Sequence, residues 1–341
     1  MAGNKGRASA IIAGLGLGAA LGLAAGTLVL APNLAGDGSE AAGGLVAQRN
    51  DAEAEAKVAK AQAETADAFI EAIGDAAVQN QLEDKPILVL RAPGSSDEDY
   101  QDLKGLLDEA GAIDSGTIEL TDSFFDQNGA DGLKSIVTNS LPAGAQLSED
   151  KLDAGTHAGE ALAAALYLDA DGKEKATTAD RAIILKALKQ DNYIEYKDGT
   201  ILPAQGVVML LDNSDNNDNG YRSNAESDFA QAMRAQGGPF VVAGGIYTAA
   251  DGATIDQLRS KDLKDEVSTV DSVDRSFAQI ATILALREQF DGEHGDYGAA
   301  ESAEAASPSP TGAKKREGSE QASSENSPSS SAERSEAAST S

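Results

Sequence analysis

The sequence contains no cysteine and no tryptophan, and only two histidines and three methionines occur in its 341 residues. Without cysteine the chain has neither disulfide bonds nor thiolate metal ligands, so its cysteine usage says nothing about the redox compartment. Beyond the initiator methionine, the soft donors that remain are His157, His294, Met209 and Met233. A conventional site for a soft metal ion is therefore hard to build from this chain.

Positive charge is scarce as well, because 27 Lys and Arg residues are set against 56 Asp and Glu residues and the net charge is −29. A chain of this charge repels phosphate backbones, so we expect no nucleic-acid partner. None of the three main apolar strand segments is followed by a nucleophile elbow, a Walker loop or a glycine fingerprint. The sequence therefore predicts a protein that is not an enzyme. A third reading, a hydrolase that acts on envelope material, has no supporting motif in the sequence.

The N-terminal region carries the longest uncharged stretch of the chain, which includes residues 8–31. About 20 helical residues span the hydrocarbon core of a bilayer, so we predict a transmembrane anchor at residues 10–31. Lys5 and Arg7 precede this stretch. The positive-inside rule then places residues 1–9 in the cytoplasm and the rest of the chain outside the cell membrane.

A cleaved signal peptide is the alternative to this anchor. Its apolar region would be unusually long, and Ala31, the best cleavage position, is followed by Pro32, which disfavours cleavage.

Glycine recurs at every fourth position of the uncharged stretch, a spacing that lets two helices approach closely. These residues are Gly14, Gly18, Gly22 and Gly26. Because the chain holds 35 glycines, chance explains the recurrence as well as helix pairing does.

Residues 45–82 are predicted to form a helical stalk, since they contain no proline and only Gly74 interrupts them weakly. Apolar residues alternate at spacings of four and three, which is the repeat of a coiled-coil seam; they are Ala52, Ala56, Ala59, Ala63, Ala66, Ile70, Ile73 and Ala77. An alanine seam buries little apolar area, so pairing would be weak. A solvated, alanine-rich spacer explains the same pattern.

Residues 85–298 are predicted to form an extracytoplasmic α/β domain. Short continuous apolar runs are typical of strands that are buried on both faces, and they occur at residues 86–90, 206–211 and 239–243. Amphipathic segments alternate with them, and the last of these covers residues 277–290. This alternation predicts a Rossmann-like, open and mainly parallel sheet.

Two regions of the chain carry little apolar or chemical signal. Residues 299–341 consist largely of Ser, Ala, Glu and Pro and contain no large apolar side chain, so we predict a disordered acidic tail. His157 precedes an alanine-rich segment without any partner of a catalytic triad nearby in the sequence. We therefore predict that it is a helix cap or an exposed surface residue.

One motif has the spacing of a calcium-binding loop, with Asp215, Asn217, Asn219 and Glu226 as oxygen ligands and a glycine at the sharp turn. The match is weak. A strand segment precedes the loop where a helix is usual, an arginine takes a position usually held by an apolar residue, and only two of the ligands are carboxylates. The alternative is an Asx-rich surface turn that leads into a helix.

From about Gly14 to Gly298, the order of these features resembles the actinobacterial copper transporter family, MctB-like, which includes SteB-like corynebacterial proteins. The resemblance combines the anchor and stalk with five short blocks, namely KPILVL at 85–90, GYRSN at 220–224, FVVAG at 240–244, VSTVDSVD at 267–274 and YG at 297–298. The last two blocks are the most specific.

The resemblance implies a role in copper transport or homeostasis in the mycolic-acid envelope, with copper as the implied metal, unknown ligands and an outer-envelope location. The SteB-like relatives imply an alternative role in daughter-cell separation. In that role a non-enzymatic scaffold works with an anchored SteA-like partner that regulates peptidoglycan hydrolysis. We expect a single-pass cell-membrane protein that forms either a homodimer or a coiled coil with such a partner.

Overall fold

A computed structural model describes residues 38–169, 171–214, 220–260 and 267–310. The predicted cytoplasmic segment and transmembrane anchor, at residues 1–9 and 10–31, lie outside the described residues. Among the residues that the structure describes, no helix has the length and the apolarity that a membrane crossing requires.

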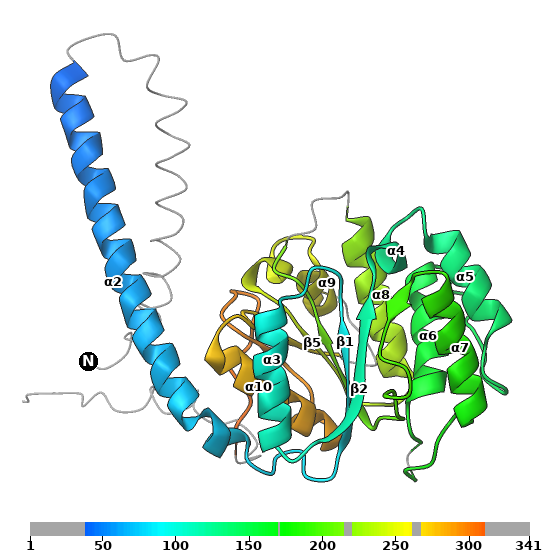
Figure 1. Cartoon of the computed structure of the whole chain (residues 1–341). Helices are drawn as coiled ribbons and strands as arrows, with labels where there is room; N and C mark the ends of the chain where they lie inside the picture. Colours follow the sequence, from blue (N-terminus) through cyan, green and yellow to red (C-terminus); the bar gives the residue numbers. More distant parts are fainter. Residues whose placement is uncertain (1–37, 170, 215–219, 261–266, 311–341) are drawn as a thin grey trace, which may run out of the picture.

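The stalk is a single helix, α2 (Gly38–Val78), of 41 residues. At 1.5 Å per residue it is about 60 Å long, and most of its length projects away from the domain (Figure 1). It begins before the predicted start at residue 45 and ends before the predicted end at residue 82. The turn that follows uses two residues in the left-handed region, Asn80 and Asp84, both with φ of 59°.

The domain is built on a seven-stranded sheet with the order β3-β2-β1-β4-β5-β6-β7. All neighbouring strands are parallel except β2 and β3, so the predicted mainly parallel sheet is confirmed. The strands are β1 (Pro86–Arg91), β2 (Ile113–Leu120), β3 (Ile194–Glu195), β4 (Gly206–Leu210), β5 (Phe240–Ala243), β6 (Ser268–Val270) and β7 (Asp296–Tyr297).

Helices cover both faces of this sheet, which explains why the central strands are continuous apolar runs. Every residue of β4 and β5 is buried. One face packs against the C-terminal end of α2, α3 (Asp97–Glu109) and α10 (Ser276–Phe290). The other packs against α4 (Asp122–Phe125), α5 (Ala130–Asn139), α6 (Ala154–Leu166), α7 (Thr178–Gln190), α8 (Tyr221–Ala235) and α9 (Thr254–Ser260).

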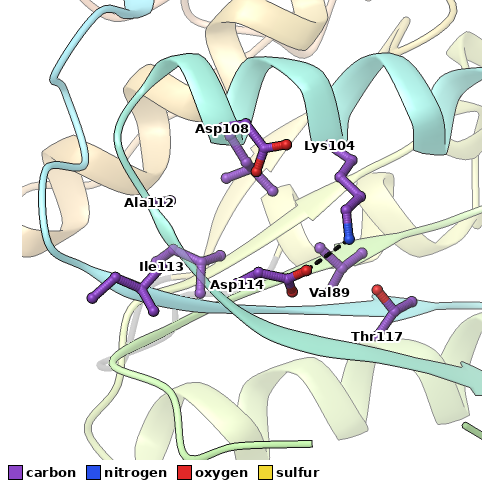
Figure 2. Close-up of a pocket in the computed structure, with 9 residues that line it drawn as sticks. Val89, Lys104, Asp108, Ala112, Ile113, Asp114 and Thr117 are labelled. Atoms are coloured by element: carbon purple, nitrogen blue, oxygen red, sulfur yellow. Dashed lines mark hydrogen bonds and ion pairs between the residues drawn. The ribbon is translucent and has the colours of Figure 1, made fainter. Parts of the chain in front are cut away.

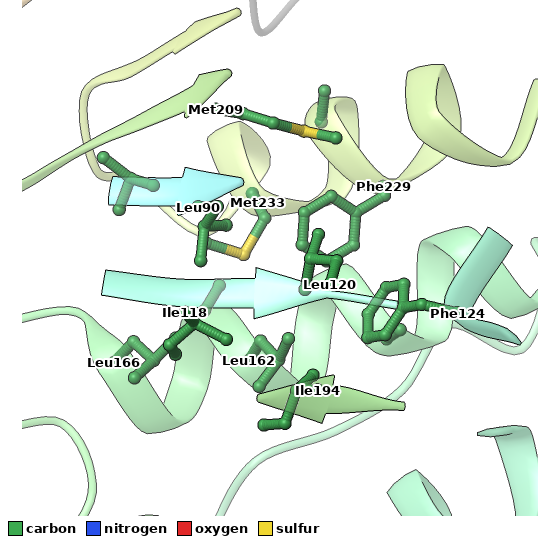
Figure 3. Packing of buried hydrophobic residues seen from close by; sticks show 14 of the residues in the cluster. Leu90, Ile118, Leu120, Phe124, Leu162, Leu166, Ile194, Met209, Phe229 and Met233 are labelled. Atoms are coloured by element: carbon green, nitrogen blue, oxygen red, sulfur yellow. The ribbon is translucent and has the colours of Figure 1, made fainter. Parts of the chain in front are cut away.

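The second face holds an aromatic cluster in which Phe229 of α8 makes edge-to-face contacts with Phe124, Phe125 and Phe240. Figure 3 shows Phe229 beside Met209 and Met233 in this core. Edge-to-face rings and adaptable thioethers fill such a core without polar groups. The cluster fixes α8 on the sheet.

The C-terminal segment remains part of the domain beyond Gly298. The backbone N–H groups of Ala299 and Ala300 donate to Asp271 Oδ1 at 2.8 and 3.1 Å, and Pro308 is buried. The prediction of a disordered tail is therefore wrong for residues 299–310, because backbone hydrogen bonds hold a segment that has no large apolar side chain. Residues 311–341 of the predicted tail lie outside the described residues.

Candidate functional site

The order of the strands reverses between β1 and β4, because the chain leaves β1 toward β2 and returns to form β4 on the other side of β1. In open α/β sheets, ligands bind outside the carboxyl ends of the strands at this point. The loops that follow Arg91 and Leu210 meet there. We therefore describe this carboxyl edge first as a candidate site.

Arg91 ends β1, and its side chain is only 11% exposed. It donates to the Ser95 carbonyl oxygen at 3.0 Å, to Asp97 Oδ1 at 2.7 Å and to Glu119 Oε1 at 3.4 Å. Its guanidinium also stacks on the Tyr100 ring, 4.7 Å from the ring centroid. Arg91 thus joins its own loop to the start of α3 and to β2, and its donors are engaged by protein groups.

The loop after β1 is joined to α8 and α9 by a second buried network. Arg222 donates to the Pro93 carbonyl oxygen at 2.7 Å and to Glu226 Oε1 at 3.1 Å, and Thr254 Oγ1 donates to Glu226 Oε2 at 2.6 Å. Glu226 is 2% exposed. Burial raises the pKa of Glu226 to about 7, although the hydrogen bonds from Thr254 and Arg222 oppose this rise.

The loop after β4 is fitted closely to its neighbours. A Cβ atom at Gly94, whose φ is +82°, would lie 3.3 Å from the Asp212 side chain, and one at Gly245 would lie 2.0 Å from Asn213. Asn213 Oδ1 accepts a hydrogen bond of 3.2 Å from the Tyr247 backbone N–H. The described part of this edge is therefore a set of interlocked loops, and its main titratable group, Glu226, is tied to protein partners.

The predicted calcium ligands divide between described and undescribed residues. Asp215, Asn217 and Asn219 lie outside the described residues. Glu226 lies in the first turns of α8, and both of its carboxylate oxygens accept hydrogen bonds from other side chains. Calcium binding therefore stays a prediction, and it would require Glu226 to give up at least one of these partners.

Three of the four soft donors lie inside the protein, whereas His294 is exposed. His157 is 7% exposed, so the predicted cap or exposed role is wrong; Asp153 caps α6 instead, and the alanine-rich helix is buried on most sides. Its Nε2 atom lies 3.1 Å from the Ser148 carbonyl oxygen, while Nδ1 is buried without a hydrogen-bond partner among the described residues. Met209 and Met233 are completely buried.

No metal cluster appears in the part of the chain that the structure describes. No group of three or more His, Asp or Glu side chains there is arranged to hold a metal ion. A small pocket lies between α3 and β2, where Lys104 Nζ contacts Asp114 Oδ2 at 2.7 Å (Figure 2). Its volume of about 10 Å³ admits roughly one water molecule, so it is too small for a ligand site.

A buried ion pair at the end of β6 explains the most specific sequence block. Arg259 Nη1 contacts Asp271 Oδ2 at 2.9 Å, and the two side chains are 3% and 0% exposed. Arg259 also donates to Thr269 Oγ1 at 2.8 Å and to the Tyr297 carbonyl oxygen at 2.6 Å. Sequence reasoning missed this pair, although an aspartate directly after the β-branched residues Thr269 and Val270 was the available signal. Its role is to hold β7 and the segment after it.

The stalk is docked on the domain through its C-terminal end. Asp67 Oδ2 accepts a hydrogen bond of 2.5 Å from Arg275 Nε, and Ile70 packs against the core cluster that includes α10. A Cβ atom at Gly74 would lie 3.2 Å from Ile280 Cδ1, so the glycine allows the two helices to approach closely. The lower third of α2 is thus fixed on α10.

Part of the predicted coiled-coil seam is used in this docking. Ile70 and Ala77 of the seam face the domain, whereas Ile73 of the seam is 47% exposed. Two large apolar residues outside the seam are also exposed, Val58 at 57% and Phe69 at 67%. The free apolar surface of the stalk therefore lies on a different side of α2 from the centre of the predicted seam.

Comparison with known proteins agrees with the blocks found along the sequence. Residues 7–308 match the family described as "Copper transport outer membrane protein, MctB". The copper transporter MctB of Mycobacterium tuberculosis is 32% identical over 238 residues, which cover 68% of this chain and 76% of that protein. The copper transporter MctB of Mycobacterium leprae is 30% identical over 229 residues, which cover 65% of this chain and 72% of that protein. The chain therefore belongs to the MctB family.

Proposed function

We propose that the chain works in copper transport or homeostasis as a non-enzymatic scaffold that is anchored in the cell membrane, with its domain outside. Its relatives are named copper transporters. The observation that carries the scaffold role is the docking of α2, because the Asp67–Arg275 pair and the Gly74–Ile280 contact fix the stalk on the domain. A fixed stalk sets both the distance and the orientation of the domain.

The distance follows from helix geometry. The part of α2 between Gly38 and Asp67 extends beyond the docked region and is about 45 Å long at 1.5 Å per residue. If residues 10–31 are retained as an anchor, the helix holds the domain well above the membrane surface. A rigid spacer of this kind positions a binding surface for partners elsewhere in the envelope.

Copper enters this proposal as cargo of a larger assembly. Met209, Met233 and His157 lie in the protein interior, where Met209 and Met233 contribute to the hydrophobic core around Phe229. Thioethers in such a position fill space between helices and sheet. We therefore assign the copper path to partners that the chain organises, or to contacts outside the described residues.

A second candidate is a scaffold in cell separation, which acts with an anchored SteA-like partner in the regulation of peptidoglycan hydrolysis. The exposed apolar side chains of Val58, Phe69 and Ile73 favour it, because they offer a helix surface for protein contact. Both candidates use the same stalk. They differ in the process that fails when the protein is lost.

The test compares a deletion strain with strains that carry the wild-type chain or a Gly74→Val chain, whose stalk can no longer sit closely on α10. Under the copper proposal, deletion lowers growth in copper and raises cell-associated copper, and only the wild-type chain restores both. Normal copper tolerance together with chained cells would reject the copper role in favour of cell separation. Full rescue by Gly74→Val at equal protein level would reject the need for a fixed stalk.

A further inference from the structure

We propose that α2 pairs in parallel with α2 of a second copy of this chain, through an exposed, uncharged face that differs from the predicted seam. This free face consists of Val58, Gln62, Thr65, Phe69, Ala72 and Ala76, with Ile73 beside it. All of these residues are exposed. The proposal rests on the proposed function in one respect, namely that both copies are anchored in one membrane.

The free face has the period of a coiled coil. Its six positions are separated by four, three, four, three and four residues, which is the spacing that keeps one stripe of a helix facing a partner. Phe69 and Val58, its two largest apolar members, are 67% and 57% exposed. Burying these side chains against a second helix would remove apolar surface from water, which is the main driving force of such association.

Two members of the free face are polar but carry no charge, Gln62 and Thr65. A glutamine amide both donates and accepts hydrogen bonds, so it can pair with the same amide of an identical helix. In coiled coils, a polar residue at one seam position lowers stability but specifies the register of the two helices. Gln62 therefore suits a weak pair of stalks that has one defined alignment.

The domain of the same chain does not cover this face. At 100° per residue, Phe69 lies about 100° around the helix axis from Ile70, which packs toward α10. Gly74 and Val78 also belong to the docked side, where a Cβ at Gly74 would contact Ile280 and Val78 is fully buried. A second helix can therefore reach the free face while the stalk stays docked.

The charges of the stalk favour an identical partner. From Lys57 to Asp75, each charged residue falls on the half of the helix opposite the free face; these residues are Lys57, Lys60, Glu64, Asp67, Glu71 and Asp75. Over this span two copies therefore meet without bringing like charges together, although the whole chain carries a net charge of −29. Nearer the N-terminus the same stripe continues through Glu55 and Asp51, so we confine the pairing to residues 58–76. The flanking positions, Ala59, Ala61, Ala66 and Ala68, carry no charge that would select a different helix.

The sequence before the stalk favours a parallel arrangement. The uncharged stretch at residues 8–31 lies shortly before α2, and its glycines recur every four residues, a pattern that permits close contact between membrane helices. Two copies anchored in the same membrane would raise their stalks in the same direction and at high effective concentration. In register, Phe69 would then meet Phe69 and Gln62 would meet Gln62.

The test uses the full chain in its native membrane, where the absence of cysteine allows single cysteines to report contacts. Thr65→Cys lies on the free face, and Glu64→Cys, its neighbour on the charged side, is the matched control. Mild oxidation is expected to give a species of twice the chain mass with Thr65→Cys and little with Glu64→Cys. Equal crosslinking of the two variants, or none with Thr65→Cys, would overturn the pairing.

A second substitution tests the apolar contact itself. Phe69→Glu is expected to lower crosslinking of the Thr65→Cys chain at least tenfold, whereas Lys60→Glu, a charge change on the opposite side, leaves it unchanged. Both variants should keep the wild-type melting temperature, since both positions are exposed on the stalk. A Thr65→Cys adduct that contains a different protein would overturn the homodimer. Crosslinking is read without a copper phenotype, so its failure is distinguishable from failure of the proposed function.

Discussion

Arg222 and Glu226, one turn apart on α8, form a hydrogen bond of 3.1 Å that closes the carboxyl edge of the sheet between β1 and β4. The same arginine reaches the Pro93 carbonyl oxygen in the loop after β1, and the same glutamate accepts from Thr254 at the start of α9. Many related folds bind a ligand at this edge. Here its described side chains join three segments of the protein to one another.

Glu226 should make the stability of the domain depend on pH. Its pKa is raised to about 7 in the folded protein by burial, whereas an unfolded glutamate titrates near its ordinary value of about 4.3. Between these two pKa values the folded chain holds one more proton at Glu226 than the unfolded chain. The contribution of Glu226 to stability is therefore fully present below about pH 4.3 and is lost as the pH rises to about 7. We expect the loss over that window to be on the order of 3–4 kcal/mol.

The measurement is urea unfolding of wild type and Glu226→Gln across this pH range. The neutral amide can still accept from Arg222 and donate to Thr254, so it should remove this part of the pH dependence and make the variant the more stable protein at pH 8. If wild type and variant keep parallel stability profiles, Glu226 does not titrate in this window.

Calcium should leave the melting temperature of the protein unchanged at millimolar concentration. A calcium ion needs the Glu226 carboxylate as a ligand at the last position of the loop, and that carboxylate is already held by Arg222 and Thr254. Thermal unfolding with calcium, compared with magnesium as the control, checks this expectation. A rise that is specific for calcium and lost in Asp215→Asn would restore the predicted site.

The sequence predicted best where one local pattern decides the structure. The strands β1, β4 and β5 are continuous apolar runs, and such runs between helices leave few alternatives to a parallel sheet. The helical period of the stalk could also be predicted from the sequence, but the side of the helix that contacts the domain could not. Alanine occupies several sides of α2, so the sequence cannot say which side faces a partner, and the docking of Ile70 on α10 decides it.

Other features depend on contacts between residues far apart in the chain. Residues 299–310 contain no large apolar side chain, yet Asp271 holds their start through two backbone N–H groups. His157 has no sequence signal for burial, because the alanine-rich helix around it reads equally well as a surface helix. The two-residue strands β3 and β7 are too short for any periodic pattern.

Breaking the Arg259–Asp271 pair should destabilise the C-terminal segment strongly. Asp271→Ala leaves a guanidinium that is 3% exposed without its carboxylate and removes the acceptor of two backbone N–H groups. Loss of one partner of a buried pair costs about 3–5 kcal/mol. Chemical unfolding should show this loss, and limited proteolysis should cut near residue 300. An Arg259→Met, Asp271→Leu double variant should lose less stability than the sum of the two single variants.

The docking of the stalk can be tested at a single atom. A valine at position 74 would bring its Cβ atom within 3.2 Å of Ile280 Cδ1, with further methyl groups beyond, whereas Gly105 on α3 has no atom within 4 Å of an added Cβ. Overpacking of a close contact costs about 1–3 kcal/mol. Gly74→Val should therefore lower the unfolding free energy by about this amount and speed hydrogen exchange in residues 67–78, while Gly105→Val keeps wild-type exchange there. If both variants behave alike, the stalk is not fixed on α10, and the observation that carries the scaffold role is lost.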